Sequence, residues 1–313
     1  MKKTRILILT IILVSLMVYF VATKIIVKPE VKRLPPIERT EFDRISERAK
    51  TYNDLESIQI YQTFIKRNPA SPDLDDAWLE AAKAWINLPR GEWVGWEGAI
   101  FSLKSLIEEY PDSEHFCLAH FLIAWCYHEM GKSDYSDYDL DNDIAISKFK
   151  DIFQVQDDKF KRYKREDSYR LSIKKYKEFI SLFPEDDLVD EALYNMARVY
   201  TIFNEFKKAE ESYEKLIEEF PEGNLADDAF YRLAESSMIQ GDYSNAITVG
   251  EKLINDYPKS DILPYAYAMV GYCYYLEKDY KKSEDTYRIL LKKYPDSDLS
   301  EVIQEFNGSK FVK

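Results

Sequence analysis

The chain has 313 residues, of which 32% are charged and 15% aromatic, and it contains only nine glycines. Its formal net charge is −13, and residues 1–36 carry seven positive charges and one negative, so residues 37–313 carry −19. So acidic a surface repels nucleic acid and anionic lipid headgroups, and it suits basic or neutral partners. A well-solvated acidic surface is the simpler interpretation, and we expect no nucleic-acid partner.

The N-terminus predicts a membrane anchor. A basic start, Met-Lys-Lys-Thr-Arg, precedes an uncharged apolar run from Ile6 to Thr23, which is long enough to cross a bilayer. The residues Val21-Ala22-Thr23 make a poor cleavage site, so residues 1–36 are predicted to be a retained anchor and basic linker, with a cleaved signal peptide as the alternative. Positive charges flank the run on both sides. The short basic tail favours the body outside the cytoplasm, on the periplasmic side of the inner membrane in a Gram-negative cell.

The body is a repeat. Four prolines stand 37 residues apart, each preceded by an aromatic residue, and fixed columns of small residues recur between them. Such a period predicts a helical solenoid in which small residues allow paired antiparallel helices to approach closely and proline ends each second helix. Serines two residues after two of the prolines are expected to cap the next helix, and the aromatic residues before the third small column are expected to fill the wedge beside it. These positions are Pro184, Pro221, Pro258 and Pro295; Ala192, Ala229 and Ala266; Ala197, Ala234 and Gly271; Ala209, Ala246 and Ser283; Ser260 and Ser297; and Phe206, Tyr243 and Tyr280.

This pattern resembles the tetratricopeptide repeat (TPR), in which Ala197, Tyr200, Phe206, Ala209 and Pro221 match the family's small, aromatic and terminating positions. The period exceeds the usual length of about 34 residues. That spacing and the Y/F-P-x-S opening resemble the subtype of bacterial envelope proteins such as BamD and YbgF. The three cysteines are Cys117, Cys126 and Cys273, so the chain lacks a lipid-attachment cysteine near its N-terminus.

The same columns indicate five repeats in an all-α body over 37–313. We expect them at 69–110, 111–183, 184–220, 221–257 and 258–294, with residues 40–68 as the first cap and 295–313 as the last. The second unit carries an insertion at 132–166, and its second helix is predicted at 167–183. An insertion inside one repeat is also a feature of BamD-like proteins.

No pattern indicates catalysis or a cofactor, and we predict that the chain is not an enzyme. One helix does gather metal-ligand types, namely His115, Cys117, His120, His128 and Cys126, so a metal-binding enzyme or sensor is the alternative. However, Cys126 shares a repeat column with Cys273, where small buried residues are expected, and the paired-ligand spacings of zinc sites are absent. Asp139, Asp141 and Asp143 begin like a calcium loop that the following residues do not complete.

The resemblance places function in the concave groove lined by each first helix. Its non-packing positions are rich in aromatic residues, which give contact area at little entropic cost. We therefore predict a membrane-anchored scaffold that binds polypeptide segments of other envelope proteins, with outer-membrane protein assembly as a role that the resemblance implies. A cytoplasmic-facing adaptor, or a groove filled by the 132–166 insertion, are the alternatives. The predicted binding residues are Phe121, Trp125, Tyr194, Arg198, Tyr231, Tyr265, Tyr272 and Tyr275; the other groove positions are Leu79, Lys83, Ile86, His128, Thr201, Glu235 and Met238.

Overall fold

The computed structural model describes residues 36–52, 54–88, 93–132, 165–297, 299–300 and 303. These residues form twelve α-helices and no strand. The helices are α2 (Pro36–Ala49), α3 (Asp54–Arg67), α4 (Leu74–Ile86), α5 (Trp93–Glu109), α6 (Phe116–Lys132), α8 (Arg165–Leu182), α9 (Val189–Ile202), α10 (Phe206–Glu219), α11 (Ala226–Ile239), α12 (Tyr243–Asp256), α13 (Leu263–Leu276) and α14 (Tyr280–Lys293). The second helix of the interrupted repeat, expected at 167–183, is α8.

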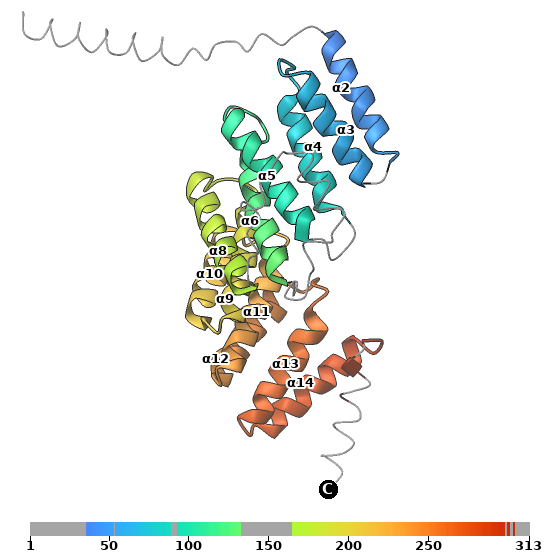
Figure 1. The fold of residues 1–313 in the computed structure, drawn as a ribbon. Coiled ribbons are helices and arrows are strands. Elements are labelled where there is room, and N and C mark those ends of the chain that lie inside the picture. Colours follow the sequence, from blue (N-terminus) through green and yellow to red (C-terminus); the bar gives the residue numbers. More distant parts are fainter. Residues whose placement is uncertain are drawn as a thin grey trace, which may run out of the picture.

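The helices stack in chain order from α2 at one end to α14 at the other (Figure 1). Each described helix packs against its neighbours in sequence, and α6 also contacts α9 while α11 contacts α13. These last two contacts join the first helices of consecutive repeats. An array held together by neighbours of this kind is a solenoid, because its stability is the sum of repeat and interface terms.

Proline and the residue before it terminate each second helix. The helices α10, α12 and α14 each end two residues before their proline, and the N–H of the intervening aromatic residue bonds back to a leucine carbonyl, as in Phe220 N to Leu216 O at 2.8 Å. The aromatic side chains at Tyr257 and Tyr294 then pack on the first helix of their own repeat. The ring of Tyr257 lies 5.4 Å from that of Phe230, and its hydroxyl donates to the carbonyl of Pro221 at 2.8 Å.

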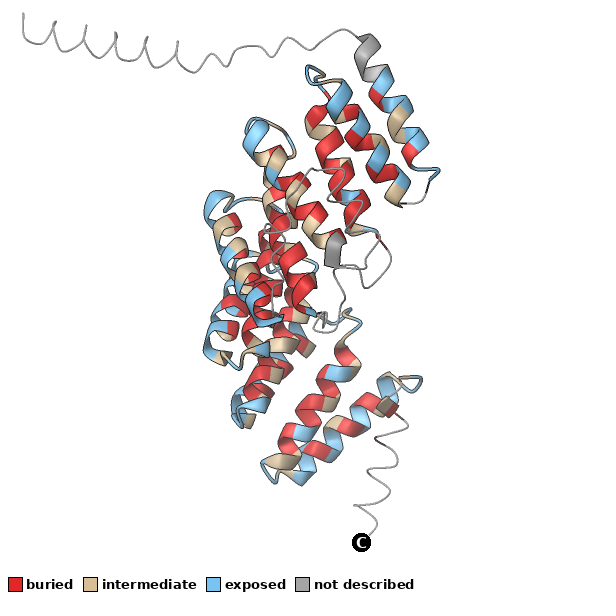
Figure 2. Ribbon diagram, in the orientation of Figure 1, coloured by how far each residue is buried: buried red, intermediate tan, exposed pale blue. Residues whose placement is uncertain are grey.

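The small columns form the contacts between helices. Ala197, Ala234 and Ala246 are all fully buried. At Gly271 even a methyl group would meet resistance, because an added Cβ would lie 2.7 Å from the ring of Tyr287. Figure 2 shows buried residues concentrated where the helices face one another. The predicted packing role of these columns is thus confirmed by their burial.

Two local predictions were wrong. Ser260 is not the N-cap of α13, which is Ile262; the hydroxyl oxygen of Ser260 instead accepts from the Ile262 N–H at 3.2 Å, one turn earlier. The extra residues after the proline form a separate turn, so the serine caps that turn. Tyr280 does not fill the wedge in its repeat, since it is 50% exposed.

The terminal predictions fall mostly outside the described residues. The apolar run from Ile6 to Thr23 lies outside them, as do residues 133–164 of the insertion predicted at 132–166, so the anchor and the insertion stay predictions. Within the described part, no helix is long and apolar enough to cross a membrane. At the other end Leu299, Ser300 and Ile303 are helical, and buried Ile303 packs on the last repeat.

Candidate functional site

The N-terminal part of the groove is a pocket between the first helices α4, α6 and α9. It has a volume of about 530 Å³, and Trp125 is central to it, with its ring 5.4 Å from that of Trp96 in an edge-on arrangement. A lysine and a glutamate supply the charges. The lining residues are Lys83, Ile86, Asn87, Leu118, Phe121, Leu122, Trp125 and Glu191. Leu118 and Leu122 were not among the predicted groove residues, although their helical spacing from Trp125 was a usable signal.

The middle of the groove is formed by α9 and α11 around Tyr194. Its half-buried ring packs edge-on against Tyr213 at 5.9 Å, and the guanidinium of Arg198 lies 5.9 Å from the ring centroid. Arg232 on α11 forms an ion pair with Glu235 at 2.8 Å. Burial lowers the pKa of Arg232, but hydrogen bonds with Glu235 and Tyr194 outweigh it and raise the pKa overall, so this guanidinium stays charged.

Among the described residues, Arg198 forms no ion pair with the nearby carboxylates of Glu191 or Glu235. Glu235 is engaged by Arg232 instead, and no acidic side chain of the described residues lies within 4.0 Å of the Arg198 guanidinium. Its guanidinium lies over the ring of Tyr194. Since no ion pair with a described side chain engages the Arg198 guanidinium, its N–H donors can bind a ligand among the neighbouring aromatic rings.

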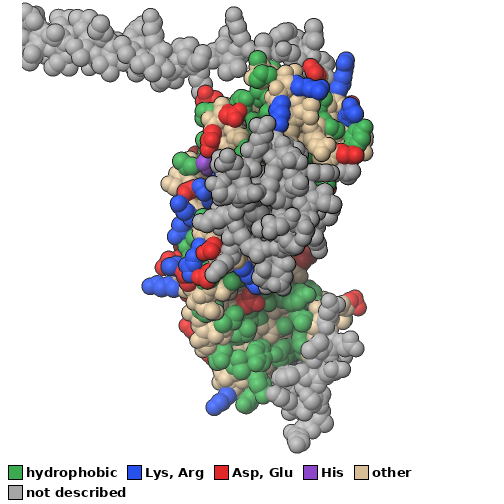
Figure 3. Space-filling model, in the orientation of Figure 1, with side chains coloured by type: hydrophobic (Ala, Val, Ile, Leu, Met, Phe, Trp, Pro, Cys, Tyr) green, Lys and Arg blue, Asp and Glu red, His purple; other side chains and the backbone are tan. Residues whose placement is uncertain are grey.

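The C-terminal part of the groove is the most exposed. Tyr265 and Tyr272 on α13 are 45% and 43% exposed, whereas Tyr231 on α11 is half-buried. The rings of Tyr272 and Tyr275 stack nearly parallel at 6.5 Å, and Tyr275 meets Tyr280 edge-on at 5.5 Å. Figure 3 shows hydrophobic side chains gathered over this end of the molecule. Tyr280 therefore extends the aromatic surface, which sequence reasoning missed by assigning it to a packing position.

Three predicted groove positions belong to the core. Phe121 is only 4% exposed and packs against Tyr176 and Phe179 of α8, at ring distances of 6.0 and 5.5 Å. His128 is 1% exposed and packs on Tyr169 of the same helix, and Leu79 is 3% exposed. The physical reason for the first two is that both side chains pack on α8, the second helix of their own repeat, which lies extensively against α6.

The metal-ligand types on α6 and on His115, the residue before it, contact different partners. His115 Nε2 pairs with Asp76 Oδ1 at 2.7 Å, and Cys117 Sγ donates to Asp186 Oδ2 at 2.9 Å. His120 packs between Phe116 and Phe183, and burial lowers its pKa. Among the described residues, no group of three or more His, Cys, Asp or Glu side chains is placed to hold a metal ion. The aspartates Asp139, Asp141 and Asp143 lie outside the described residues.

The two buried cysteines take the packing role expected of their column. Cys126 and Cys273 are both fully buried, as is Val199 in the same column, and Ser236 is 1% exposed. Burial raises the pKa of the Cys273 thiol to about 11, so it stays a neutral, unreactive thiol at physiological pH.

Stacked helix pairs with small residues at their contacts define a helical repeat protein, and comparison with known families identifies the repeat. Residues 190–222, 228–260 and 265–297 match family models described as tetratricopeptide repeat. These three segments are tetratricopeptide repeats, each with a first and a second helix drawn from α9 to α14. The predicted tetratricopeptide repeats are thus confirmed within residues 190–297, while the BamD and YbgF subtype stays a prediction.

Solved structures with similar helical folds include a type IV pilus biogenesis factor, PilW, with 13% identity, a TM-score of 0.48, and coverage of 87% of this chain and all of that one. A MamA protein has 16% identity, a TM-score of 0.48 and coverage of 71% and 92%. BtubC from P. vanneervenii has 13% identity, a TM-score of 0.48 and coverage of 79% and 90%. Nothing about function follows from likeness at this level. No curated protein sequence matches this chain.

Proposed function

We propose that this protein is a scaffold that binds an extended polypeptide segment along the groove formed by the first helices of its repeats. The observation that carries the proposal is the exposed aromatic surface on α13. Tyr265 and Tyr272 leave nearly half of their accessible area in solvent, although neither is needed to fill the core. Exposed apolar area gathered in one place marks an interaction site.

An extended chain fits this groove better than a small molecule. Its aromatic positions are distributed over α6, α9, α11 and α13, from Trp125 to Tyr275, and do not converge on one enclosed cavity. Tyrosine gives a partner both a flat apolar face and a hydroxyl, so it recognises main chain and side chains alike. Arg198 adds a donor for a peptide carbonyl or carboxylate in the middle of the groove.

The segment at Ile6–Thr23 is proposed to tether the scaffold to the cytoplasmic membrane with the repeats outside the cytoplasm. The basic start, the apolar run and the weak cleavage site support this placement. Its partners would then be envelope proteins, and assembly of outer-membrane proteins is one role in keeping with the resemblance to BamD. A reporter fused after Lys313 should be active only in the exported compartment and should sediment with membranes. Activity in the cytoplasm would instead make the protein a cytoplasmic-facing adaptor.

Site-specific crosslinking tests the groove directly. A photoreactive amino acid placed at Tyr272 should capture a polypeptide in intact cells, and the captured segment can be identified by mass spectrometry. Tyr52 is the matched control, because it is 42% exposed at the opposite end of the array. Capture at Tyr272 but not at Tyr52 supports the proposal, whereas equal capture at both positions contradicts it.

Tyrosine truncation provides the second test. Tyr265→Ala and Tyr272→Ala should weaken capture while leaving the melting temperature nearly unchanged, because both rings are exposed. Tyr194→Ala should weaken capture and also lower stability, since that ring packs on Tyr213 and Arg198. A Tyr265 and Tyr272 double variant that binds like the parent would place the site elsewhere on the protein.

A further inference from the structure

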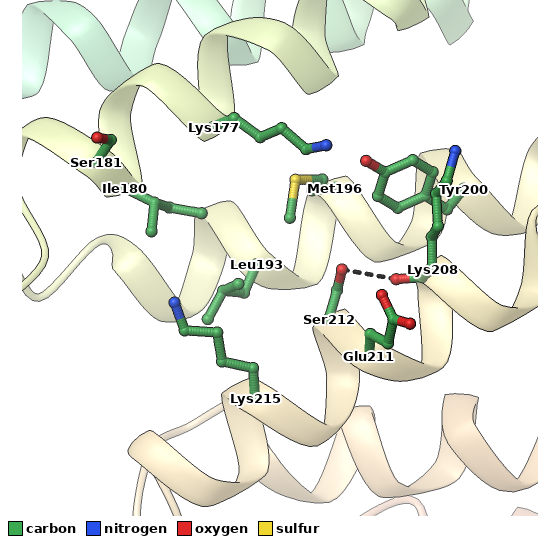
Figure 4. A pocket seen from close by; sticks show the side chains of 10 residues that line it. All are labelled: Lys177, Ile180, Ser181, Leu193, Met196, Tyr200, Lys208, Glu211, Ser212 and Lys215. Carbon is green, nitrogen blue, oxygen red and sulfur yellow. Dashed lines mark hydrogen bonds between the residues drawn. The ribbon is translucent and has the colours of Figure 1, made fainter.

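A second hollow lies away from the groove, between α8, α9 and α10 (Figure 4). Its volume is about 560 Å³. The residues that α9 contributes are Leu193, Met196 and Tyr200, whereas Tyr194 and Arg198, at predicted groove positions on the same helix, do not line it. Because successive residues of a helix are about 100° apart, these two sets lie on different sides of α9. We call this second hollow the outer pocket.

The outer pocket has an apolar floor. Ile180 of α8 and Leu193 and Met196 of α9 meet at its centre, and Figure 4 shows their side chains converging there. Leu193 is 2% and Met196 7% exposed, so most of their surface is held by the core and only their outer edges face the hollow. A floor of this kind can accept one further apolar side chain without rearrangement of the helices.

Three lysines surround this floor. Lys177 and Lys208 flank the ring of Tyr200 at one end, with their ammonium groups 5.6 and 5.5 Å from the ring centroid. Lys215 lies at the other end, beyond Leu193 (Figure 4). One carboxylate, that of Glu211, also lines the pocket, so the lining side chains carry three positive charges and one negative, and Glu205 and Glu219 beside it pair with two of the lysines. An excess of lysine in the lining, on a body whose net charge is −19, favours an anionic ligand.

The lysines can exchange their present ion-pair partners for carboxylates of a bound peptide. Lys208 pairs with Glu205 at 2.5 Å and Lys215 with Glu219 at 3.7 Å, both at exposed positions where such pairs contribute little. Lys177 has no acidic side chain of the described residues within 4.0 Å. A carboxylate from a partner can therefore bind Lys177 directly and replace the weak pair of Lys215 without leaving a buried charge unpaired.

We propose that the outer pocket binds an acidic peptide segment in which an apolar side chain stands between two acidic ones. In an extended chain the residues i, i+2 and i+4 point to the same side, so the pattern acidic-x-apolar-x-acidic presents two carboxylates with an apolar group between them. That order matches the lysines at both ends and the apolar floor between them. A compact anion such as phosphate engages one end only and leaves the floor uncovered.

This site is distinct from the groove in both position and chemistry. The groove offers aromatic rings, and the outer pocket offers cations around an aliphatic floor. Because the two sets of residues lie on different sides of α9, a single scaffold can hold two polypeptides of different character at once. The binding of an acidic segment does not depend on the groove being occupied.

Direct binding of a defined probe tests the proposal. The probe is a peptide containing Asp-Ser-Leu-Ser-Asp, labelled with an uncharged dye and titrated with the full chain in neutral detergent while fluorescence anisotropy is followed. We expect saturable binding that weakens as salt is added. Replacing the leucine of the probe by serine, or its aspartates by lysines, should abolish binding.

Charge reversal locates the site. Lys177→Glu and Lys215→Glu should each weaken binding by about fivefold. Charge reversal removes one attraction and adds one repulsion, so its effect on the binding free energy is about twice that of losing one exposed ion pair. Lys207→Glu is the matched control, because this exposed residue on α10 undergoes the same charge change but does not line the pocket. Far-UV circular dichroism should be unchanged in all three variants.

Four results would overturn the proposal. Lys207→Glu weakening binding as much as Lys177→Glu would mean that attraction to the surface is unspecific. If the probe with serine in place of leucine bound as tightly as the original probe, the apolar floor would have no part in binding. Loss of binding in Tyr272→Ala would place the peptide in the groove instead. Binding of vesicles containing phosphatidylserine, with none of the peptide, would make the outer pocket a lipid contact.

Discussion

The close contact between Gly271 and Tyr287 predicts that a glycine-to-alanine substitution in a helix will lower the stability of this protein, the reverse of its usual effect. Replacing a glycine by alanine inside a helix normally stabilises it, by about 1 kcal/mol. At Gly271 the added Cβ would lie 2.7 Å from Cε1 and 3.0 Å from Cδ1 of the Tyr287 ring, whereas carbon atoms at rest lie about 3.5–4.0 Å apart. Tyr287 is 4% exposed, so its ring has little room to move.

The two effects can be compared directly. Overpacking a tight core contact costs about 1–3 kcal/mol, which exceeds the gain in helix propensity over most of its range. Gly271→Ala should therefore destabilise the protein by about 1 kcal/mol. Urea denaturation followed by far-UV circular dichroism measures this difference. A Gly271→Ala variant more stable than the parent would refute the assigned packing of α13 against α14.

A double-mutant cycle separates the contact from general damage. Tyr287→Leu removes the outer ring atoms that the new methyl group would meet. If the clash causes the loss, Gly271→Ala in the Tyr287→Leu background should cost less than it does alone, with a coupling energy of about 0.5–3 kcal/mol. Losses that add within about 0.5 kcal/mol would show that the two side chains do not touch.

Three further perturbations follow from buried residues. Ala234→Trp should destabilise the protein by about 1–3 kcal/mol or more in urea denaturation, because Ala234 is fully buried; a parent-like midpoint would mean that the repeat register is wrong. Burial and neighbouring positive charges lower the pKa of His128 to about 3 from 6.5, so between these two pH values only the unfolded chain binds the proton and stability should fall by about 1.4 kcal/mol per pH unit as pH falls. His128→Phe should abolish that slope, and a retained slope would assign it to another group. Burial raises the pKa of Glu97 to about 7 from 4.5, only partly opposed by Lys104, so here stability should fall as pH rises from 4.5 to 7. Glu97→Gln should therefore be more stabilising at pH 8 than at pH 5, and an equal effect at both would show that the carboxylate is solvated.

The repeat could be predicted from sequence because its information is local. Proline at a fixed period, small residues such as Ala197 and Ala234, and the aromatic residue before each proline act within one repeat or on the next. The helices α9 to α14 follow this pattern, and the structure confirmed it there. Each second helix ends close to its proline, because proline lacks an N–H and its ring clashes with the preceding turn, and no distant contact can restore that hydrogen bond.

Exposure at the candidate site could be predicted only in part. Tyr265 and Tyr272 occupy groove positions and are exposed, as the repeat pattern indicated. Phe121 occupies an equivalent position in its own repeat but is buried, because its ring packs on Phe179 of α8. The repeat pattern describes an average unit and does not show how far the paired helix covers a given side chain.

The sequence by itself determined the helical repeat, its period and the aromatic character of the groove, since these depend on spacing along the chain. Only the tertiary structure decided which side chains from different helices contact one another. His115 finds Asp76 and Cys117 finds Asp186, partners 39 and 69 residues away, which separates groups that a single helix had suggested as one metal site. The outer pocket arises in the same way, because its lysines come from α8 and α10 and its apolar floor comes from α8 and α9. Stacking of repeats brings such residues together through accumulated rotations of whole helices, and no local pattern records that geometry.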